Sequence, residues 1–170
     1  MVRSEYQIVT HPRCVIDYSQ GNLTELIRDG YGFYGQEALI DQVRYEYGNA
    51  DKVYFALNKN GSEIGSLSIG LRPNKENDPF WTTLQTQVHK SLDMNVLACY
   101  IYGIVVRPEV RREGIASRLL SRMIEDLSPQ IIFGQTKVPE AVFLRAKVAR
   151  LYGYRTFFGF REVTPNFDYK

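Results

Sequence analysis

The sequence has few cysteines and no long apolar run, and each shortage narrows the class of protein. Its cysteines, Cys14 and Cys99, are isolated and lack the spacing of metal ligands. No segment approaches the roughly 20 apolar residues of a membrane span. The N-terminal residues also lack the charged-then-apolar order of a signal peptide. We therefore expect a cytoplasmic protein in a reducing compartment, with no membrane segment and no metal.

The chain also lacks a marked excess of charge of either sign. It carries 21 Lys and Arg against 19 Asp and Glu, a formal net charge of +2. This balance is too near neutral for a dedicated polyanion binder, so nucleic acid is a possible partner that the charge does not indicate. A hydrophobic content of 44% supports an ordinary buried core. The length of 170 residues fits a single domain spanning 1–170.

The first half of the chain alternates β-prone and helical patterns. One or both of the runs 6–10 and 14–18 predict a first strand. Helices are predicted over 22–29, ended by Gly30, and over 36–47, where Leu39, Ile40, Val43 and Tyr47 have helical spacing. Strands 53–57 and 64–71 flank an Asn60-Gly61 step, which is typical of a hairpin. A helix is predicted inside the connection 74–93.

The second half predicts a strand over 96–106, apolar enough to be buried on both faces. A helix follows Gly114 and places Ile115, Leu119, Met123 and Leu127 on one stripe. A buried strand over 131–136, a helix over 140–152 and a strand over 156–163 complete the chain. The order βααββ(α)βαβαβ predicts an α/β fold with a twisted mixed sheet and helices on both faces.

The most informative segment joins strand 96–106 to the next helix and reads Val106-Arg107-Pro108-Glu109-Val110-Arg111-Arg112-Glu113-Gly114. Pro108 ends the strand, because proline has no amide proton and restricts its predecessor. Gly114 lets the backbone come close to a ligand where the helix begins. Unbonded amides at a helix N-terminus, beside Arg111 and Arg112, suit phosphate oxygens. We interpret this bend as a cradle for a pyrophosphate.

The bend Arg111-x-x-Gly114-x-Ala116, after Val106-x-Pro108, resembles the acetyl-CoA signature of the GCN5-related N-acetyltransferase (GNAT) superfamily. The later segments Ala149-Arg150-Leu151-Tyr152 and Gly159-Phe160-Arg161-Glu162-Val163 are similar to the family's final helix and its "GF" strand. The resemblance covers essentially the whole chain in the expected order. It implies the GNAT fold and an enzyme that transfers an acetyl group from acetyl-CoA to a primary amine.

The resemblance also implies where acetyl-CoA would bind. The diphosphate would lie in the cradle, and the pantetheine arm would follow the strand edge where strands 96–106 and 131–136 splay apart. The implied cosubstrate-binding residues are Ile104, Val105, Val106, Arg111, Arg112, Glu113, Gly114, Ile115, Ala116 and Ser117. Arg107, Arg118 and Arg122 add basic character nearby.

The chemistry needs two proton movements. The resemblance implies that a tyrosine near the end of the helix before the "GF" strand gives a proton to the leaving thiolate, and the candidates are Tyr154 and, close behind it, Tyr152. The family's strand glutamate is replaced by Tyr100, so the base stays open between a water chain and a carboxylate from elsewhere, such as Asp93. Tyr100, Tyr102 and Trp81 are candidates for the acceptor site.

Two alternatives stay open at this stage. One is a catalytically silent acyl-CoA-binding module with the GNAT fold, and the other is a family member that acts on nucleic acid or aminoacyl-tRNA. The acceptor could be a small molecule or a protein. The last strand is short, so a second copy of the chain could complete that sheet edge as a homodimer.

Overall fold

The computed structural model describes residues 5–12, 21–32, 35–73, 97–134, 144, 147–148, 155–158 and 161–162. They fall into two compact units. The first comprises Met1–Gly70 and Tyr102–Met123, and the second comprises Leu71–Ile101 and Ile124–Lys170. Strand β4 (Leu97–Val106) and helix α4 (Ile115–Leu127) each supply residues to both units.

Antiparallel strands form the sheet of the first unit, in the order β1-β2-β3-β4. Strand β1 (Tyr6–Pro12) pairs with β2 (Lys52–Asn58), and β2 pairs with β3 (Glu63–Pro73). The second half of β4 lies beside β3, where the Arg107 amide donates to the Ile64 carbonyl at 3.0 Å. The predicted first strand over 6–10 is confirmed, and the run 14–18 lies outside the described residues.

The predicted hairpin between β2 and β3 is confirmed. Asn58 closes its turn, since its Oδ1 accepts hydrogen bonds from the amides of Asn60 and Ser62 at 2.9 and 3.0 Å. Gly61 has a φ of +80°, a left-handed conformation that a side chain disfavours. The turn residues thus fix the register of two strands that position the rest of the unit.

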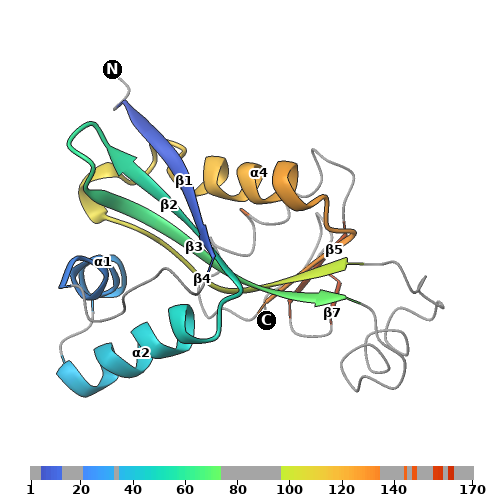
Figure 1. The fold of residues 1–170 in the computed structure, drawn as a ribbon, viewed down its shortest axis with the longest axis horizontal. Helices are drawn as coiled ribbons and strands as arrows, with labels where there is room; N and C mark the ends of the chain where they lie inside the picture. Colours follow the sequence, from blue (N-terminus) through green and yellow to red (C-terminus); the bar gives the residue numbers. More distant parts are fainter. Residues whose placement is uncertain are drawn as a thin grey trace. The chain divides into compact units, whose positions relative to one another are not determined.

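Helices cover both faces of this sheet, with α1 (Gly21–Tyr31) and α2 (Gln36–Gly48) on one side and α4 on the other (Figure 1). The predicted helix over 36–47 is confirmed. The predicted end of the first helix at Gly30 is wrong, because the turn falls at Gly32, which has a φ of +68°. Gly30 lies inside α1, where any Cβ would overlap the side chain of Val105.

The core of the first unit lies between α1, α2 and the strands. Its buried members are Leu23, Leu26, Ile27, Leu39, Val43, Tyr47, Ala50, Val53, Phe55 and Val105. The prediction that Ile40 belongs to this apolar face is wrong, since Ile40 is 39% exposed. Glu46 takes a place on the buried face instead and is fully enclosed.

Strand β4 differs from its predicted burial. Its residues alternate between buried and half-buried positions, so one face is closed and the other is partly open. Cys99 is buried, as expected for a small apolar side chain. Helix α4 has the predicted stripe, with Ile115, Leu119 and Met123 at 1% exposure or less.

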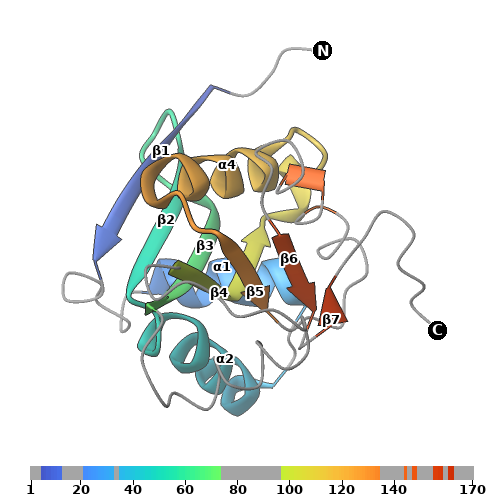
Figure 2. The same cartoon turned by 90° about the vertical axis from the view of Figure 1, so that its right-hand side faces the viewer.

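The second unit contains β4, β5 (Ile131–Gly134), β6 (Arg155–Phe158) and β7 (Arg161–Glu162), which lie side by side (Figure 2). The pairs β4–β5 and β5–β6 are parallel, whereas β7 runs antiparallel to β6. The predicted single strand over 156–163 is therefore wrong. The chain instead reverses between Phe158 and Arg161, and these two residues pair.

Two predicted helices can be only partly compared with the structure. The helix expected within 74–93 lies outside the described residues. Of the helix expected over 140–152, Leu144, Lys147 and Val148 are described and are helical, and Val148 is 3% exposed. The mixed sheet flanked by helices confirms the predicted α/β fold class.

Candidate functional site

The bend between β4 and α4 has the backbone that a close ligand requires. After Val106, the short 3-10 helix η2 (Pro108–Val110) turns the chain, and Pro108 begins it. Arg112 and Gly114 then have φ angles of +67° and +86°. Arginine rarely adopts this left-handed conformation, so the geometry of the bend holds Arg112 in an unfavourable state. Such strain is common where a binding site needs a particular backbone.

The start of α4 presents donors at this bend. The Arg118 amide donates to the Gly114 carbonyl at 3.0 Å, which is the first turn of the helix. Amides earlier than Arg118 precede the helical ladder and have no acceptor within it. A Cβ placed on Gly114 would meet nothing within 4 Å, so the space above the glycine is open. The bend therefore offers backbone donors and room for an anion at the positive end of a helix dipole.

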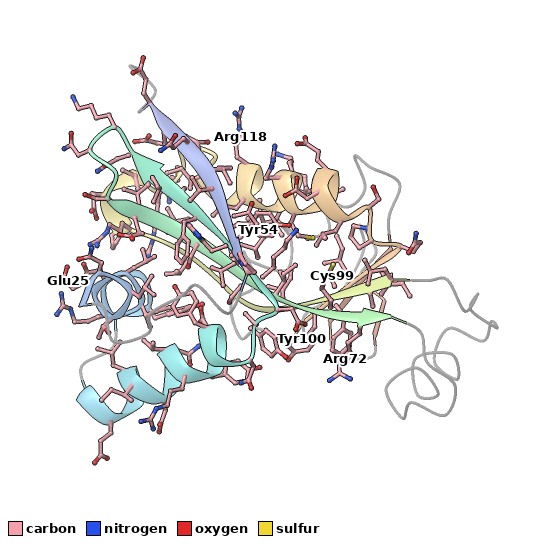
Figure 3. The ribbon with its side chains drawn as sticks, viewed as in Figure 1. Glu25, Tyr54, Arg72, Cys99, Tyr100 and Arg118 are labelled. Atoms are coloured by element: carbon pink, nitrogen blue, oxygen red, sulfur yellow. The ribbon has the colours of Figure 1, made fainter. Side chains whose placement is uncertain are left out.

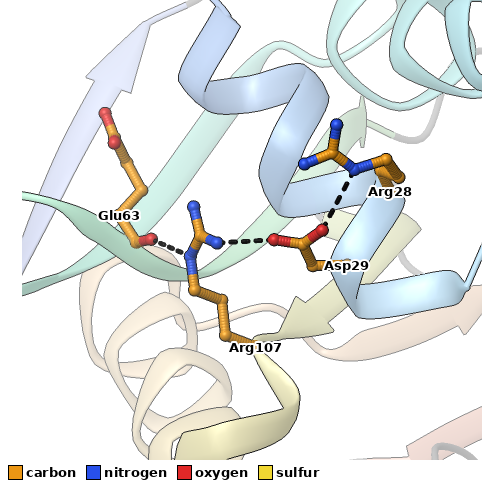
Figure 4. Close-up of polar contacts among 4 residues, drawn as sticks. All are labelled: Arg28, Asp29, Glu63 and Arg107. Atoms are coloured by element: carbon orange, nitrogen blue, oxygen red, sulfur yellow. Dashed lines mark hydrogen bonds and ion pairs between the residues drawn. The ribbon is translucent and has the colours of Figure 1, made fainter.

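Two of the predicted basic residues make hydrogen bonds to protein groups, and Figure 4 shows one of them, Arg107. Arg107 pairs with Asp29 of α1 through Nη1 and Oδ2 at 2.7 Å, and its Nε donates to the Glu63 carbonyl at 2.9 Å. Arg111 donates from Nε to the Val106 carbonyl at 3.2 Å and from Nη2 to the Gly30 carbonyl at 2.5 Å. The expectation that Arg107 adds basic character to the cradle is thus wrong. Both arginines fasten the end of α1 to the bend.

The exposed basic residues near the bend are Arg111, Arg112, Arg118 and Arg122. Arg118 points away from the sheet on the outer side of α4 (Figure 3). These residues leave positive charge at the surface beside the open helix start. Their positive charges suit a ligand that carries several phosphate groups.

The predicted strand edge extends beyond the part of β4 that pairs with β5. That pairing ends at Ile101 and Gly134, whereas β4 continues to Val106. Of the residues predicted to face the pantetheine arm, Val105 is 3% exposed and belongs to the core, and Ile104 and Val106 are half-buried. Val105 thus packs against α1, and its backbone is what the site can use.

Of the residues predicted to bind the acceptor or to donate a proton, two lie in the described part of the chain. Tyr102 makes an edge-on contact with Tyr45 of α2, with ring centroids 5.6 Å apart. Tyr100 contacts Phe133 at 5.2 Å. Trp81, Tyr152 and Tyr154 lie outside the described residues. The roles assigned to all five remain predictions.

A buried carboxyl group next to β4 was not predicted from the sequence. Glu46 is 0% exposed, and its Oε1 accepts a hydrogen bond from Gln42 Nε2 at 2.7 Å. Burial raises the pKa of Glu46 to about 7, although hydrogen bonds from Tyr31 and Gln42 favour the ionised form. The available signal was its spacing, because Glu46 follows Val43 by three residues and so shares the face that packs inward.

Two tyrosines close to this carboxyl group also have shifted pKa values. Burial raises the pKa of Tyr31, and the charge of Glu46 raises it further. Burial likewise raises the pKa of Tyr47, whose hydroxyl lies 2.8 Å from Ser66 Oγ. Both phenols therefore stay protonated at neutral pH and can donate hydrogen bonds.

Among the described residues, no three His, Cys, Asp or Glu side chains gather as a metal site would need. In the same part of the chain, no helix combines the length and the apolar character needed to cross a membrane.

The fold and the bend define an α/β protein with a mixed sheet and an anion-receiving helix start. Residues 21–152 match the family model described as the acetyltransferase (GNAT) family. The chain belongs to this family. The predicted resemblance is therefore confirmed at the level of the family and its acetyltransferase fold. No curated protein sequence matches the chain.

Solved structures with this fold include a putative acetyl transferase from Pyrococcus furiosus, with a TM-score of 0.53 and 19% identity over 88% of this chain and 93% of that one. A ribosomal-protein-alanine N-acetyltransferase from Brucella melitensis aligns with a TM-score of 0.51 and 16% identity over 88% and 90%. A GNAT family N-acetyltransferase from Escherichia coli, solved with CoA, has a TM-score of 0.47 and 14% identity. That alignment covers 73% of this chain and 57% of that chain. At these identities the likeness to the first two of these structures concerns the fold alone.

Proposed function

We propose that the chain is an acetyl-CoA-dependent N-acetyltransferase that transfers the acetyl group directly to a primary amine. The observation that carries the proposal is the bend before α4. Arg112 and Gly114 hold a left-handed backbone there, and the space above Gly114 is open at the helix start. Membership of the acetyltransferase family supports the same activity. The diphosphate of acetyl-CoA fits the donors and the space of this bend.

The proposed division of work follows from the positions of the residues. The amides from Arg112 to Ser117, with Glu113, Ile115 and Ala116 between them, hold the diphosphate. The backbone of Ile104, Val105 and Val106 lies along the pantetheine arm, where an amide near Val106 polarises the thioester carbonyl. Holding the thioester and the amine together supplies most of the acceleration.

The remaining predicted roles enter the proposal unchanged. Tyr154 or Tyr152 donates a proton to the leaving thiolate, and Tyr100, Tyr102 and Trp81 contact the acceptor. The acceptor is a small molecule or a protein amine. A cytoplasmic setting and a homodimer belong to the proposal as well.

A matched pair of glycine variants tests the cradle. Gly114→Glu places bulk and negative charge where the diphosphate would lie, so we expect acetyl-CoA affinity to fall at least about 100-fold by calorimetry. Gly61→Glu is the control, because Gly61 also has a positive φ and open space above it but lies in the β2–β3 turn. Equal acetyl-CoA affinity in the two variants would contradict the site.

A second candidate function is an acyl-CoA-binding module without catalysis. It is favoured by the lack of any carboxylate in β4, whose sequence is Leu-Ala-Cys-Tyr-Ile-Tyr-Gly-Ile-Val-Val. Release of free thiol from acetyl-CoA in the presence of primary amines separates the two functions. Binding without amine-dependent release would favour the module.

A further inference from the structure

Glu46 is a buried ionisable side chain with few hydrogen-bond partners and no ion-pair partner among the described residues. Among the described residues, its Oε2 is buried without a hydrogen-bond partner, while Oε1 accepts from Gln42. No lysine, arginine or histidine of the described chain forms an ion pair with it. A buried acid left half-satisfied costs stability, so such a group is usually retained for a reason other than packing.

The chain makes room for this carboxyl group at one point of β4. A Cβ on Gly103 would overlap the carboxyl atoms of Glu46, so glycine is required there for the acid to lie against the strand. The neighbouring Ile104 is the first of the residues proposed to follow the pantetheine arm. The carboxyl group is therefore placed beside the segment of backbone that the proposed reaction uses.

Tyr31 connects this carboxyl group with the surface. Its hydroxyl is hydrogen-bonded to Glu46 and also interacts with the backbone of Ile104. The residue as a whole is 38% exposed, so Tyr31 reaches from the buried carboxyl group to the surface. The titratable groups that face Glu46 in the described chain are thus Tyr31 from α1 and Tyr47 from α2.

We propose that Glu46 is the proton acceptor of the acetyl transfer and that the Tyr31 hydroxyl passes the proton to it. This assignment rests on the proposed function. Glu46 of α2 would act as the base, because β4 contains no carboxylate.

The acceptor enters as an ammonium ion and gives one proton to the Tyr31 hydroxyl as that hydroxyl gives its own proton to the Glu46 carboxylate. The neutral amine attacks the thioester carbonyl, a C–N bond forms and the C–S bond breaks. The nitrogen loses its second proton to water, the thiolate gains a proton from its tyrosine donor, and that tyrosine regains a proton from water. Glu46 then returns its proton to water by way of the Tyr31 hydroxyl. Burial raises the pKa of Glu46 to about 7, close to the value at which a base works best near neutral pH.

The experiment measures kcat against pH for the full chain, with acetyl-CoA and two primary amines of different basicity, glycinamide and benzylamine. In the parent protein we expect kcat to rise through an inflection near pH 7 that is the same for both amines. Glu46→Gln keeps the size of the side chain and should lower kcat about 100-fold or more and remove that inflection. Acetyl-CoA affinity by calorimetry should stay within a factor of two, because Glu46 is not part of the cradle.

Gln42→Leu is the matched variant. It removes a hydrogen bond to the Glu46 carboxylate without removing the carboxyl group, so the inflection should move to higher pH while kcat at high pH is retained. A merely structural Glu46 would give an unchanged pH profile in this variant.

The outcomes separate the two proposals. A parent protein that binds acetyl-CoA but acetylates neither amine would overturn the proposed function, and this assignment with it. Normal turnover in Glu46→Gln, or an inflection that follows the pKa of each amine, would overturn the role of Glu46 alone. Loss of the inflection with intact acetyl-CoA binding would support it.

Discussion

The bend before α4 and the Glu46 carboxyl group both lie next to the second half of β4, but they differ in whether water can reach their polar groups. The bend is exposed, and its donors are backbone amides that water can satisfy when no ligand is bound. Glu46 is enclosed, and water cannot reach the oxygen that the protein leaves unpaired. The unoccupied donors of the bend therefore cost the folded state little free energy, whereas an ionised Glu46 lowers the free energy of unfolding. One region is best tested with a ligand and the other with pH.

The largest expected effect concerns stability at Glu46. Its pKa rises from 4.5 to about 7 on folding. Between these two values the folded state holds a proton that the unfolded state has lost, so stability falls as pH rises through this window. The loss amounts to about 3 kcal/mol above pH 7. Glu46→Gln cannot ionise, so its stability should not carry this loss.

Urea unfolding at pH 5 and pH 8 measures this difference. The change in unfolding free energy between the two pH values, taken for the parent minus Glu46→Gln, should be about 3 kcal/mol. The subtraction removes groups that titrate in both proteins. A difference near zero would mean that Glu46 is solvated in solution, and the contrast with the bend would disappear.

A smaller effect is expected where the bend is fastened to α1. Asp29→Asn removes the carboxylate that pairs with Arg107, whose side chain is 19% exposed. The pair is partly screened by solvent, so we expect a loss of about 1 kcal/mol in thermal or urea unfolding. The loss should shrink as salt is added. Glu25→Gln is the matched control, because Glu25 is an exposed acid on α1 that points into solvent (Figure 3). If both variants cost the same, the Arg107 pair contributes nothing to the bend.

These regions also differ in how well the sequence predicts them. The bend was predictable because Pro108 and Gly114 act locally, through backbone conformation and the lack of a side chain. The β2–β3 hairpin was predictable for the same reason, since Asn58 and Gly61 determine the turn by themselves. Glu46 was not predicted, because its burial depends on Gly103, which is distant in sequence and close only after folding.

The same distinction explains the errors. Gly30 was predicted to end α1, but its role is to let Val105 approach, which is a tertiary requirement. Arg107 was predicted to face the ligand from its position in the sequence. Its partner Asp29 comes from α1, and only the folded chain brings the two within 2.7 Å.

The smallest expected effect is the change in stability when backbone strain is relieved at Arg112 in the bend or at Ser128, which also has a positive φ. Arg112 and Ser128 have φ angles of +67° and +45°. Glycine relieves this strain but adds freedom to the unfolded chain, so Arg112→Gly and Ser128→Gly should each stabilise the protein by about 0.5 kcal/mol. Ser128 lies at the far end of α4, away from the bend, and its variant should leave acetyl-CoA affinity unchanged. Arg112→Gly should weaken that affinity several-fold, by loss of a cation beside the diphosphate, and the defect should diminish at high salt. Calorimetry at two salt concentrations measures this, and equal affinities in the two variants would show that the strain at Arg112 serves the backbone path alone.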